Sequence, residues 1–188
     1  FDLSDNINSL RDWSAAIEVA GVPSHLYGTI SSDLTTPVRR GEVSYRLACA
    51  AALCSALAYF DVPPVQPPMR ARVFEWGSFQ ATTIRGDGPM LVCAFRGSEL
   101  VTPSPRLLLA DWLNTLGGAF AIEATHSFRL PGFVHGGFHR GVVGLLESGL
   151  ADELNAHAAA HDGDRCILLT GHSKGAAMAA AAAGLAAA

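Results

Sequence analysis

The stretch Ile167 to Met178, ILLTGHSKGAAM, decides the fold of this chain. Its apolar first part has the length of a β-strand and breaks at Gly171, whereas the residues after Gly175 are small and favour a helix. Between them lies a G-x-S-x-G pattern, in which a serine occupies a sharp strand-to-helix turn and its neighbours must be small because the two elements pass close together. The pattern predicts Ser173 as a nucleophile; the alternative is an ordinary turn bounded by glycines.

The composition favours a globular protein and gives no sign of a nucleic-acid-binding or membrane-spanning one. The chain has 188 residues, of which 49% are hydrophobic and 16% charged, as expected of one globular domain with a sizeable core. The net charge of −4 and the scattered basic residues give no indication of nucleic-acid binding. No apolar run has the character of a transmembrane segment, and the sequence leaves cytoplasmic and secreted locations open.

Cysteine and histidine positions indicate no bound group. Cys49 and Cys54 fall in a predicted helix, and Cys93 and Cys166 in predicted strands, so all four are expected to be buried free thiols. The Cys, His, Asp and Glu residues lack the spacing of metal ligands, and there is no glycine-rich phosphate loop. We therefore expect neither a metal nor an organic cofactor.

Hydrophobic periodicity predicts an alternation of helices and strands. The strand–helix–strand–helix order of the second half indicates an α/β fold with at least one parallel crossover, and Met90 to Phe95 predicts a strand covered on both faces. Helices are expected at 5–20, 42–60, 107–116, 138–160 and from 174 onward, with a hairpin at 72–76 and 79–84 and further strands at 119–128 and 165–170.

Four stretches together resemble the class 3 lipase family, the fungal-type branch of the α/β-hydrolases. They are Ala51 to Tyr59 (AALCSALAY), Val92 to Ser98 (VCAFRGS), Val134 to Phe138 (VHGGF) and Thr170 to Gly175 (TGHSKG). The resemblance implies an α/β fold with a mixed, mostly parallel sheet flanked by helices. The resemblance spans roughly residues 43–188. The length of the chain predicts one domain over residues 1–188, with an N-terminal helix and loop at 1–40 and a core at 41–188.

The resemblance also implies roles for individual residues. Ser173 is similar to the family's nucleophile, which forms an acyl-enzyme. Ser98 resembles the oxyanion-hole residue, although a simple turn serine is the alternative, and the backbone N–H of Lys174 would be the second donor. The family's mobile lid corresponds to residues 99–116, for which a fixed helix packed on the core is the alternative.

The residues around the nucleophile carry further expectations. The side chain of His172 is expected to pack behind the strand, and that of Lys174 to project from the first helical turn. His135 corresponds to a structural histidine of the family, and His139 has no assigned role. The remaining histidines fall in predicted loops or on polar helix faces: His25, His126, His157 and His161.

The catalytic acid and base implied by the family are not found in this sequence. In α/β-hydrolases an Asp and then a His follow the nucleophile along the chain, yet residues 174–188 contain no Asp, Glu or His. The predicted helix there also lacks a cap or polar stop. We therefore expect the chain to be the N-terminal part of a longer domain, truncated after the helix that follows the nucleophile.

Three functions are consistent with this sequence. The first is a serine hydrolase that cleaves acylglycerols or related lipid esters, acting where lipid meets water. The second is a phospholipase or an esterase for soluble esters, because the acyl pocket is not readable from sequence. The third, from a different class, is a catalytically inactive hydrolase-like binding module. The sequence gives no oligomeric state.

Overall fold

The computed structural model describes residues 44–98, 121–123, 133–160 and 165–187. The predicted N-terminal helix and loop, the predicted lid at 99–116 and most of the predicted strand at 119–128 lie outside these residues. The described elements, in chain order, are α3 (Tyr45–Leu57), β1 (Arg70–Trp76), β2 (Phe79–Arg85), β3 (Met90–Phe95), β4 (Ala121–Glu123), β5 (Phe133–His135), α6 (Gly136–Leu145), the π-helical segment η1 (Leu146–Leu150), α7 (Ala151–Ala159), β6 (Cys166–Gly171) and α8 (Lys174–Ala187).

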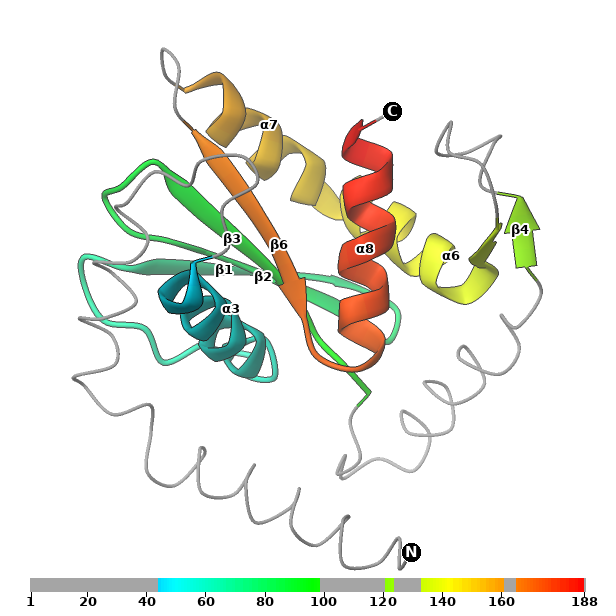
Figure 1. The fold of residues 1–188 in the computed structure, drawn as a ribbon, viewed down its shortest axis with the longest axis horizontal. Helices are drawn as coiled ribbons and strands as arrows, with labels where there is room; N and C mark the ends of the chain where they lie inside the picture. The colour runs from blue at the N-terminus through cyan, green and yellow to red at the C-terminus, as the bar shows by residue number, and fades with distance from the viewer. Residues whose placement is uncertain (1–43, 99–120, 124–132, 161–164, 188) are drawn as a thin grey trace, which may run out of the picture.

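A four-stranded sheet with the order β1-β2-β3-β6 forms the centre of the described structure (Figure 1). The predicted hairpin is confirmed: β1 and β2 are antiparallel and turn at Gly77, whose φ of 58° suits a glycine. Strand β2 is antiparallel to β3, and β3 is parallel to β6, which confirms the predicted crossover. The sheet is therefore mixed, but in the part the structure describes its pairings are antiparallel except for β3 with β6, contrary to the mostly parallel sheet expected.

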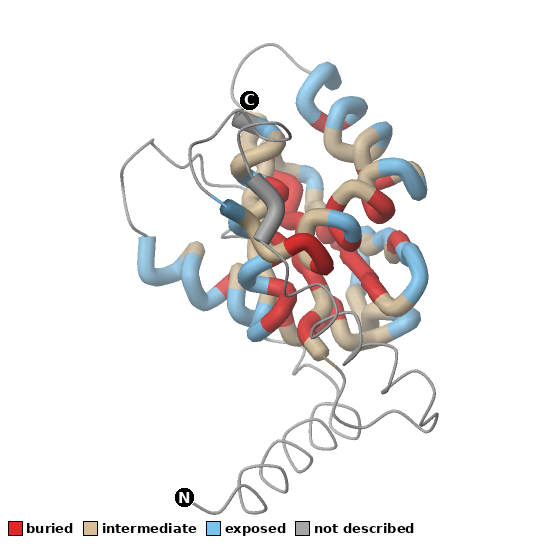
Figure 2. The backbone as a smooth tube through the Cα atoms, turned by 90° about the vertical axis from the view of Figure 1, so that its right-hand side faces the viewer, coloured by how far each residue is buried: buried red, intermediate tan, exposed pale blue. Residues whose placement is uncertain are grey.

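Helices cover both faces of this sheet, and β6 passes between α3 on one side and α8 on the other (Figure 1). Strand β3 separates the two layers because its side chains alternate between faces. All six of its residues are fully buried, as predicted, and buried positions gather at the centre of the described structure (Figure 2). The α3 layer contains Met90, Val92 and Ala94 of β3 with Cys54 and Leu57. The opposite layer contains Leu91, Cys93 and Phe95 with Val142, Leu145 and Met178 from α6 and α8.

Helix α3 matches the predicted helix at 42–60 within a few residues at each end. It begins after Ser44, whose side-chain oxygen accepts a hydrogen bond from the backbone N–H of Leu47 at 3.3 Å. Its buried face includes Ala50, Cys54, Ser55 and Leu57. Its other side is exposed and carries Tyr45, which is 83% exposed. The helix therefore packs on the sheet through a single face.

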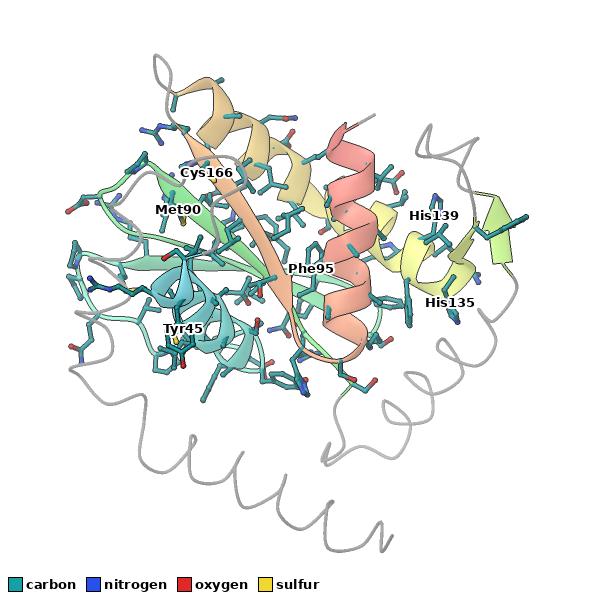
Figure 3. All side chains as sticks on the ribbon, viewed as in Figure 1. Tyr45, Met90, Phe95, His135, His139 and Cys166 are labelled. Atoms are coloured by element: carbon teal, nitrogen blue, oxygen red, sulfur yellow. The ribbon has the colours of Figure 1, made fainter. Side chains whose placement is uncertain are left out.

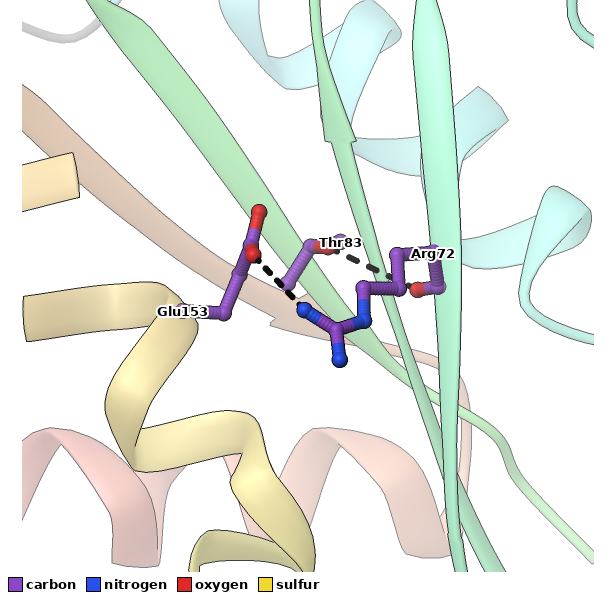
Figure 4. Close-up of polar contacts among 3 residues, drawn as sticks. All are labelled: Arg72, Thr83 and Glu153. Carbon is purple, nitrogen blue, oxygen red and sulfur yellow. Dashed lines mark hydrogen bonds and ion pairs between the residues drawn. The ribbon is translucent and has the colours of Figure 1, made fainter. Parts of the chain in front are cut away.

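The helix predicted at 138–160 is interrupted by a kink. Helix α6 begins at Gly136, and the π-helical segment η1 contains Gly149 at φ 104°, a conformation that residues with side chains rarely adopt. Beyond the kink, Glu153 of α7 forms an ion pair with Arg72 of β1 at 3.2 Å, and Thr83 donates to the carbonyl of Arg72 at 3.5 Å (Figure 4). The ion pair attaches the second half of the helix to the edge strand of the sheet, and the Thr83 bond joins β2 to that same strand.

A second, two-stranded antiparallel sheet is formed by β4 and β5. Strand β4 covers three residues of the strand predicted at 119–128, of which 119–120 and 124–128 lie outside the described residues. Strand β5 was not predicted, because three residues are too few to show a period of two. Among the described helices, none has the length and apolar character needed to cross a membrane.

Candidate functional site

Ser173 lies on the turn between β6 and α8. Its φ is 54°, which makes it the only non-glycine residue with positive φ in the described part of the chain. A residue with a side chain pays about 1–2 kcal/mol for this left-handed conformation. Strained backbone of this kind is concentrated at functional sites, and the Ser173 side chain is exposed to solvent.

The two glycines of the G-x-S-x-G pattern allow this turn to be tight. A β-carbon at Gly171 would overlap the backbone of Gly175, and a β-carbon at Gly175 would overlap the carbonyl oxygen of Phe95. The first helical turn closes through hydrogen bonds from Gly175 N to the carbonyl of His172 (2.9 Å) and from Ala176 N to that of Ser173 (3.0 Å). The glycines are therefore required by direct backbone contact.

The segment that carries Ser98 lies against this turn. Strands β3 and β6 pair in parallel with Phe95 opposite Gly171, so both strands end at the same level of the sheet. A β-carbon at Gly97 would lie 2.6 Å from the carbonyl oxygen of His172, which precedes Ser173. Ser98, half-buried, follows directly. Two of the residues singled out from the sequence, Ser98 and Ser173, are thus carried by neighbouring chain segments.

The side chain of Lys174 does not point in the expected direction. Its side chain was expected to project from the first turn of α8, yet the residue is only 7% exposed. Its ammonium group lies 5.0 Å from the ring centroid of Phe79, in the geometry of a cation–π contact. Phe79 in turn packs against Gly141 of α6, so the lysine stem lies within the layer between helices and sheet. Tertiary packing, which the sequence does not reveal, determines this orientation.

His172 also differs from expectation, because its side chain is exposed and does not pack behind the strand. Its Nδ1 lies 2.9 Å from the hydroxyl of Tyr59, and the two ring centroids are 6.2 Å apart. Sequence reasoning did not assign Tyr59 to the site. The available signal was its position as the last residue of the first stretch that resembles the family, Ala51 to Tyr59.

His135 and His157 have structural contacts. His135, which lies beside α6 in Figure 3, caps that helix: its Nδ1 accepts from the backbone N–H groups of Gly137 (3.2 Å) and Phe138 (3.4 Å). His157 was expected on a polar face but is only 2% exposed, with Nε2 3.1 Å from the carbonyl oxygen of Pro89. Burial lowers the pKa of His157 below its ordinary value of 6.5, and the nearby charge of Arg165 lowers it further.

The cysteines are free, as expected, but not all are buried. Burial raises the pKa values of Cys54 and Cys93 to about 12, which keeps both thiols protonated and unreactive at neutral pH. Cys49 is exposed on α3, contrary to expectation, and Cys166 at the start of β6 is half-buried. Among the described residues, no group of three or more His, Cys, Asp or Glu is placed to hold a metal ion.

Comparison with known families agrees with this geometry. The family described as Lipase (class 3) matches residues 92–187, just over half of the chain, which includes Ser98, the helix-capping His135 and the turn at Ser173. Comparisons with curated proteins and with solved structures give no significant match. The family implies an α/β-hydrolase fold, with which the mixed sheet and its flanking helices are consistent. The chain therefore belongs to the class 3 lipase family, a family of hydrolases that act on lipid esters.

Proposed function

We propose that the protein hydrolyses carboxylic esters of lipids, with acylglycerols as the principal substrate class, through an acyl-enzyme on Ser173. The observation that carries the proposal is the exposed serine held at φ 54° between a parallel strand and the helix that follows it. A serine in this position has its hydroxyl free of the strand and the helix, at the point where the helix directs its unpaired backbone N–H groups.

The reaction would proceed in two steps. The Oγ of Ser173 attacks the ester carbonyl carbon, and its proton passes to a general base. The base gives this proton to the leaving oxygen as the C–O bond of the tetrahedral intermediate breaks, so the alcohol departs and an acyl-enzyme remains. A water molecule then attacks the acyl carbon, the Ser173 oxygen regains a proton, and the carboxylic acid leaves. We do not assign the base to His172, His135 or His157: His172 bonds to Tyr59, His135 caps α6, and His157 is buried against Pro89.

The negative oxygen of the tetrahedral intermediate needs hydrogen-bond donors. We propose the backbone N–H of Lys174 and the backbone N–H of Ser98, with the Ser98 hydroxyl as a further donor. The proximity of the Gly97 backbone to the carbonyl of His172 supports this assignment, because it brings the Ser98 segment to the turn that holds Ser173. Loss of one such donor typically lowers kcat by about 10²–10³.

Labelling with a fluorophosphonate, followed by peptide mapping, tests the nucleophile. We expect one adduct, on Ser173, together with hydrolysis of a short-chain nitrophenyl ester, and we expect Ser173→Ala to abolish both. Ser148→Ala is the matched control, since Ser148 is also exposed but lies in η1, where it bonds to the carbonyl of Leu145 at 2.8 Å. Hydrolysis that persists in Ser173→Ala would contradict the proposal.

The substrate class requires a separate comparison. We expect the protein to hydrolyse an emulsified triacylglycerol faster than phospholipid vesicles or a soluble short-chain ester. Faster release of fatty acid from the vesicles would identify a phospholipase, and a preference for the soluble ester would identify an esterase. Binding of the emulsion without labelling or turnover would instead indicate an inactive binding module.

A further inference from the structure

The hydroxyl of Tyr59 joins two segments that are remote in sequence. It lies 2.9 Å from Nδ1 of His172, the residue before the proposed nucleophile. The phenol and the imidazole both carry groups able to hydrogen-bond at this distance, so the contact is a direct link from Tyr59 to the nucleophile turn.

The same hydroxyl also contacts the segment that carries Ser98. A β-carbon at Gly97 would overlap the Tyr59 hydroxyl and would lie 2.6 Å from the carbonyl oxygen of His172. Gly97 is thus enclosed between the phenol and the backbone of the nucleophile turn. Because these three groups are in contact, the position of Tyr59 defines the spacing between the Ser98 segment and the turn at Ser173.

Gln80 holds the backbone on both sides of Tyr59. Its side-chain Nε2 donates to the carbonyl oxygens of Ala58 and Phe60, at 3.1 Å in each case, and the residue is only 1% exposed. Its backbone carbonyl accepts from the N–H of Arg96 at 2.9 Å, immediately before Gly97. Buried hydrogen bonds of this kind are costly to break, so they fix the end of α3 relative to the Ser98 segment.

We propose that Tyr59 is a positioning residue for ester hydrolysis: its hydroxyl holds His172 and Gly97 together, and so aligns the Ser173 nucleophile with the oxyanion donors at Ser98. The inference rests on the proposed function, since alignment matters only if Ser173 reacts. Tyr59 itself takes no part in bond making or breaking. It acts through the two segments that it contacts, and both must keep their separation while charge develops on the carbonyl oxygen.

Tyr59→Phe tests the inference, because it removes only the oxygen that joins the two segments. We expect kcat for a short-chain nitrophenyl ester to fall about ten-fold with KM little changed, since misplacement of donors weakens transition-state binding selectively. The rate of fluorophosphonate labelling at Ser173 should fall in parallel. Tyr45→Phe is the matched control: it removes a hydroxyl from the first residue of α3, at the opposite end of that helix from the Tyr59 turn, where Tyr45 is 83% exposed, and it should leave both rates unchanged.

His172→Phe removes the other partner of the bond. If Tyr59 acts through this bond, the double variant Tyr59→Phe with His172→Phe should be no slower than the slower single variant. A double variant whose losses multiply would show that the two residues act independently, and would overturn the inference.

Hydrogen exchange supplies a measurement that does not depend on activity. The amides of Gly175 and Ala176 bond to the carbonyls of His172 and Ser173, so they report directly on the turn. We expect Tyr59→Phe to accelerate exchange in the peptide that contains them and to leave β1 and β2 unchanged. If Tyr59→Phe changes neither the exchange of these amides nor kcat, the inference is overturned. It is also overturned if amide exchange accelerates equally throughout the protein while kcat per folded molecule stays at the wild-type value, because Tyr59 would then have a merely structural role.

This design separates the two proposals. A wild-type protein that neither reacts with the fluorophosphonate nor hydrolyses an ester would refute the proposed function. In that case, acceleration confined to the turn peptide would still support Tyr59 as the residue that positions it, and unchanged exchange would refute both proposals.

Discussion

The backbone of Gly175 lies so close to that of Phe95 that a β-carbon on the glycine would overlap the phenylalanine carbonyl oxygen. Phe95 is the last residue of β3, and Gly175 is the second residue of α8. The same β-carbon would come within 2.8 Å of the Phe95 carbonyl carbon and 3.0 Å of that of Arg96. These are backbone atoms and cannot rotate away, so α8 can approach the sheet this closely only because residue 175 is a glycine and has no β-carbon.

We therefore predict that Gly175→Ala destabilises the protein by about 1–3 kcal/mol, the usual cost of overpacking. Helix propensity alone predicts the opposite sign, because alanine in a helix interior is more favourable than glycine by about 1 kcal/mol. Urea unfolding followed by circular dichroism distinguishes the two. Ala180→Ser, at an exposed position of the same helix, is the control and should change the free energy of unfolding little. An increase in stability on Gly175→Ala would contradict the close approach of the Gly175 and Phe95 backbones.

A second prediction concerns the hydroxyl pair that joins α3 to the end of β6. The Oγ of Ser55 lies 2.9 Å from Oγ1 of Thr170, one residue before the turn that holds Ser173. We expect a double-mutant cycle of Ser55→Ala and Thr170→Val to give a coupling free energy of about 0.5–1.5 kcal/mol in urea unfolding. Thr83→Val, on β2, is the control, and its effect on the free energy of unfolding should simply add to that of Ser55→Ala. Zero coupling between Ser55→Ala and Thr170→Val would contradict a hydrogen bond between the two hydroxyls.

Much of the fold follows from the sequence because local patterns agree with it. The six apolar residues Met90 to Phe95 are short enough to be a strand and lack any polar face, so burial on both sides is their natural arrangement. The kink at Gly149 could not be predicted, because a single glycine is tolerated within a helical pattern and no residue nearby indicates positive φ.

The candidate site could be predicted only in part. The spacing of Gly171, Ser173 and Gly175 predicts a tight turn because backbone contact excludes larger residues at fixed local positions. The contact between Tyr59 and His172 joins residues 113 positions apart, and no periodicity encodes it; the place of Tyr59 at the end of the stretch that resembles the family does not reveal its partner. The direction of the Lys174 side chain likewise depends on the ring of Phe79, which the sheet brings to it.

A third prediction concerns the start of α6. Nδ1 of His135 accepts from the first backbone N–H groups of the helix, and its ring stacks on Phe138 with centroids 4.1 Å apart. We expect His135→Ala to be less stable than His135→Asn by about 0.5–2 kcal/mol in urea unfolding, because asparagine restores the cap whereas both variants lose the stacked ring. Equal stability of the two variants would show that the stacking, and not the cap, is what His135 contributes.

The fourth prediction concerns pH and His157, which joins α7 to the beginnings of β3 and β6. Because the carbonyl of Pro89 can only accept, Nε2 carries the proton; because the Arg165 guanidinium can only donate, Nδ1, at 3.1 Å, is unprotonated. Protonation would break the bond to Arg165 and bury a positive charge. Burial is the main cause of the lowered pKa, the charges of Arg165 and Arg85 add to it, and hydrogen bonds to the backbone of Pro89 and Cys166 oppose it.

The sign of the pH dependence follows from this lowered pKa. Above 6.5 the imidazole is neutral in both the folded and the unfolded chain, so its full contribution to stability is present. As the pH falls from 6.5 towards the folded-state pKa, the unfolded chain binds a proton that the folded chain does not, and the free energy of unfolding declines by up to about 1.4 kcal/mol per pH unit. We expect urea unfolding between pH 8 and pH 5 to show this decline in the wild type. His157→Gln, which cannot titrate, should be less stable at pH 8 but lose less stability on acidification; parallel curves for the two proteins would contradict the assignment.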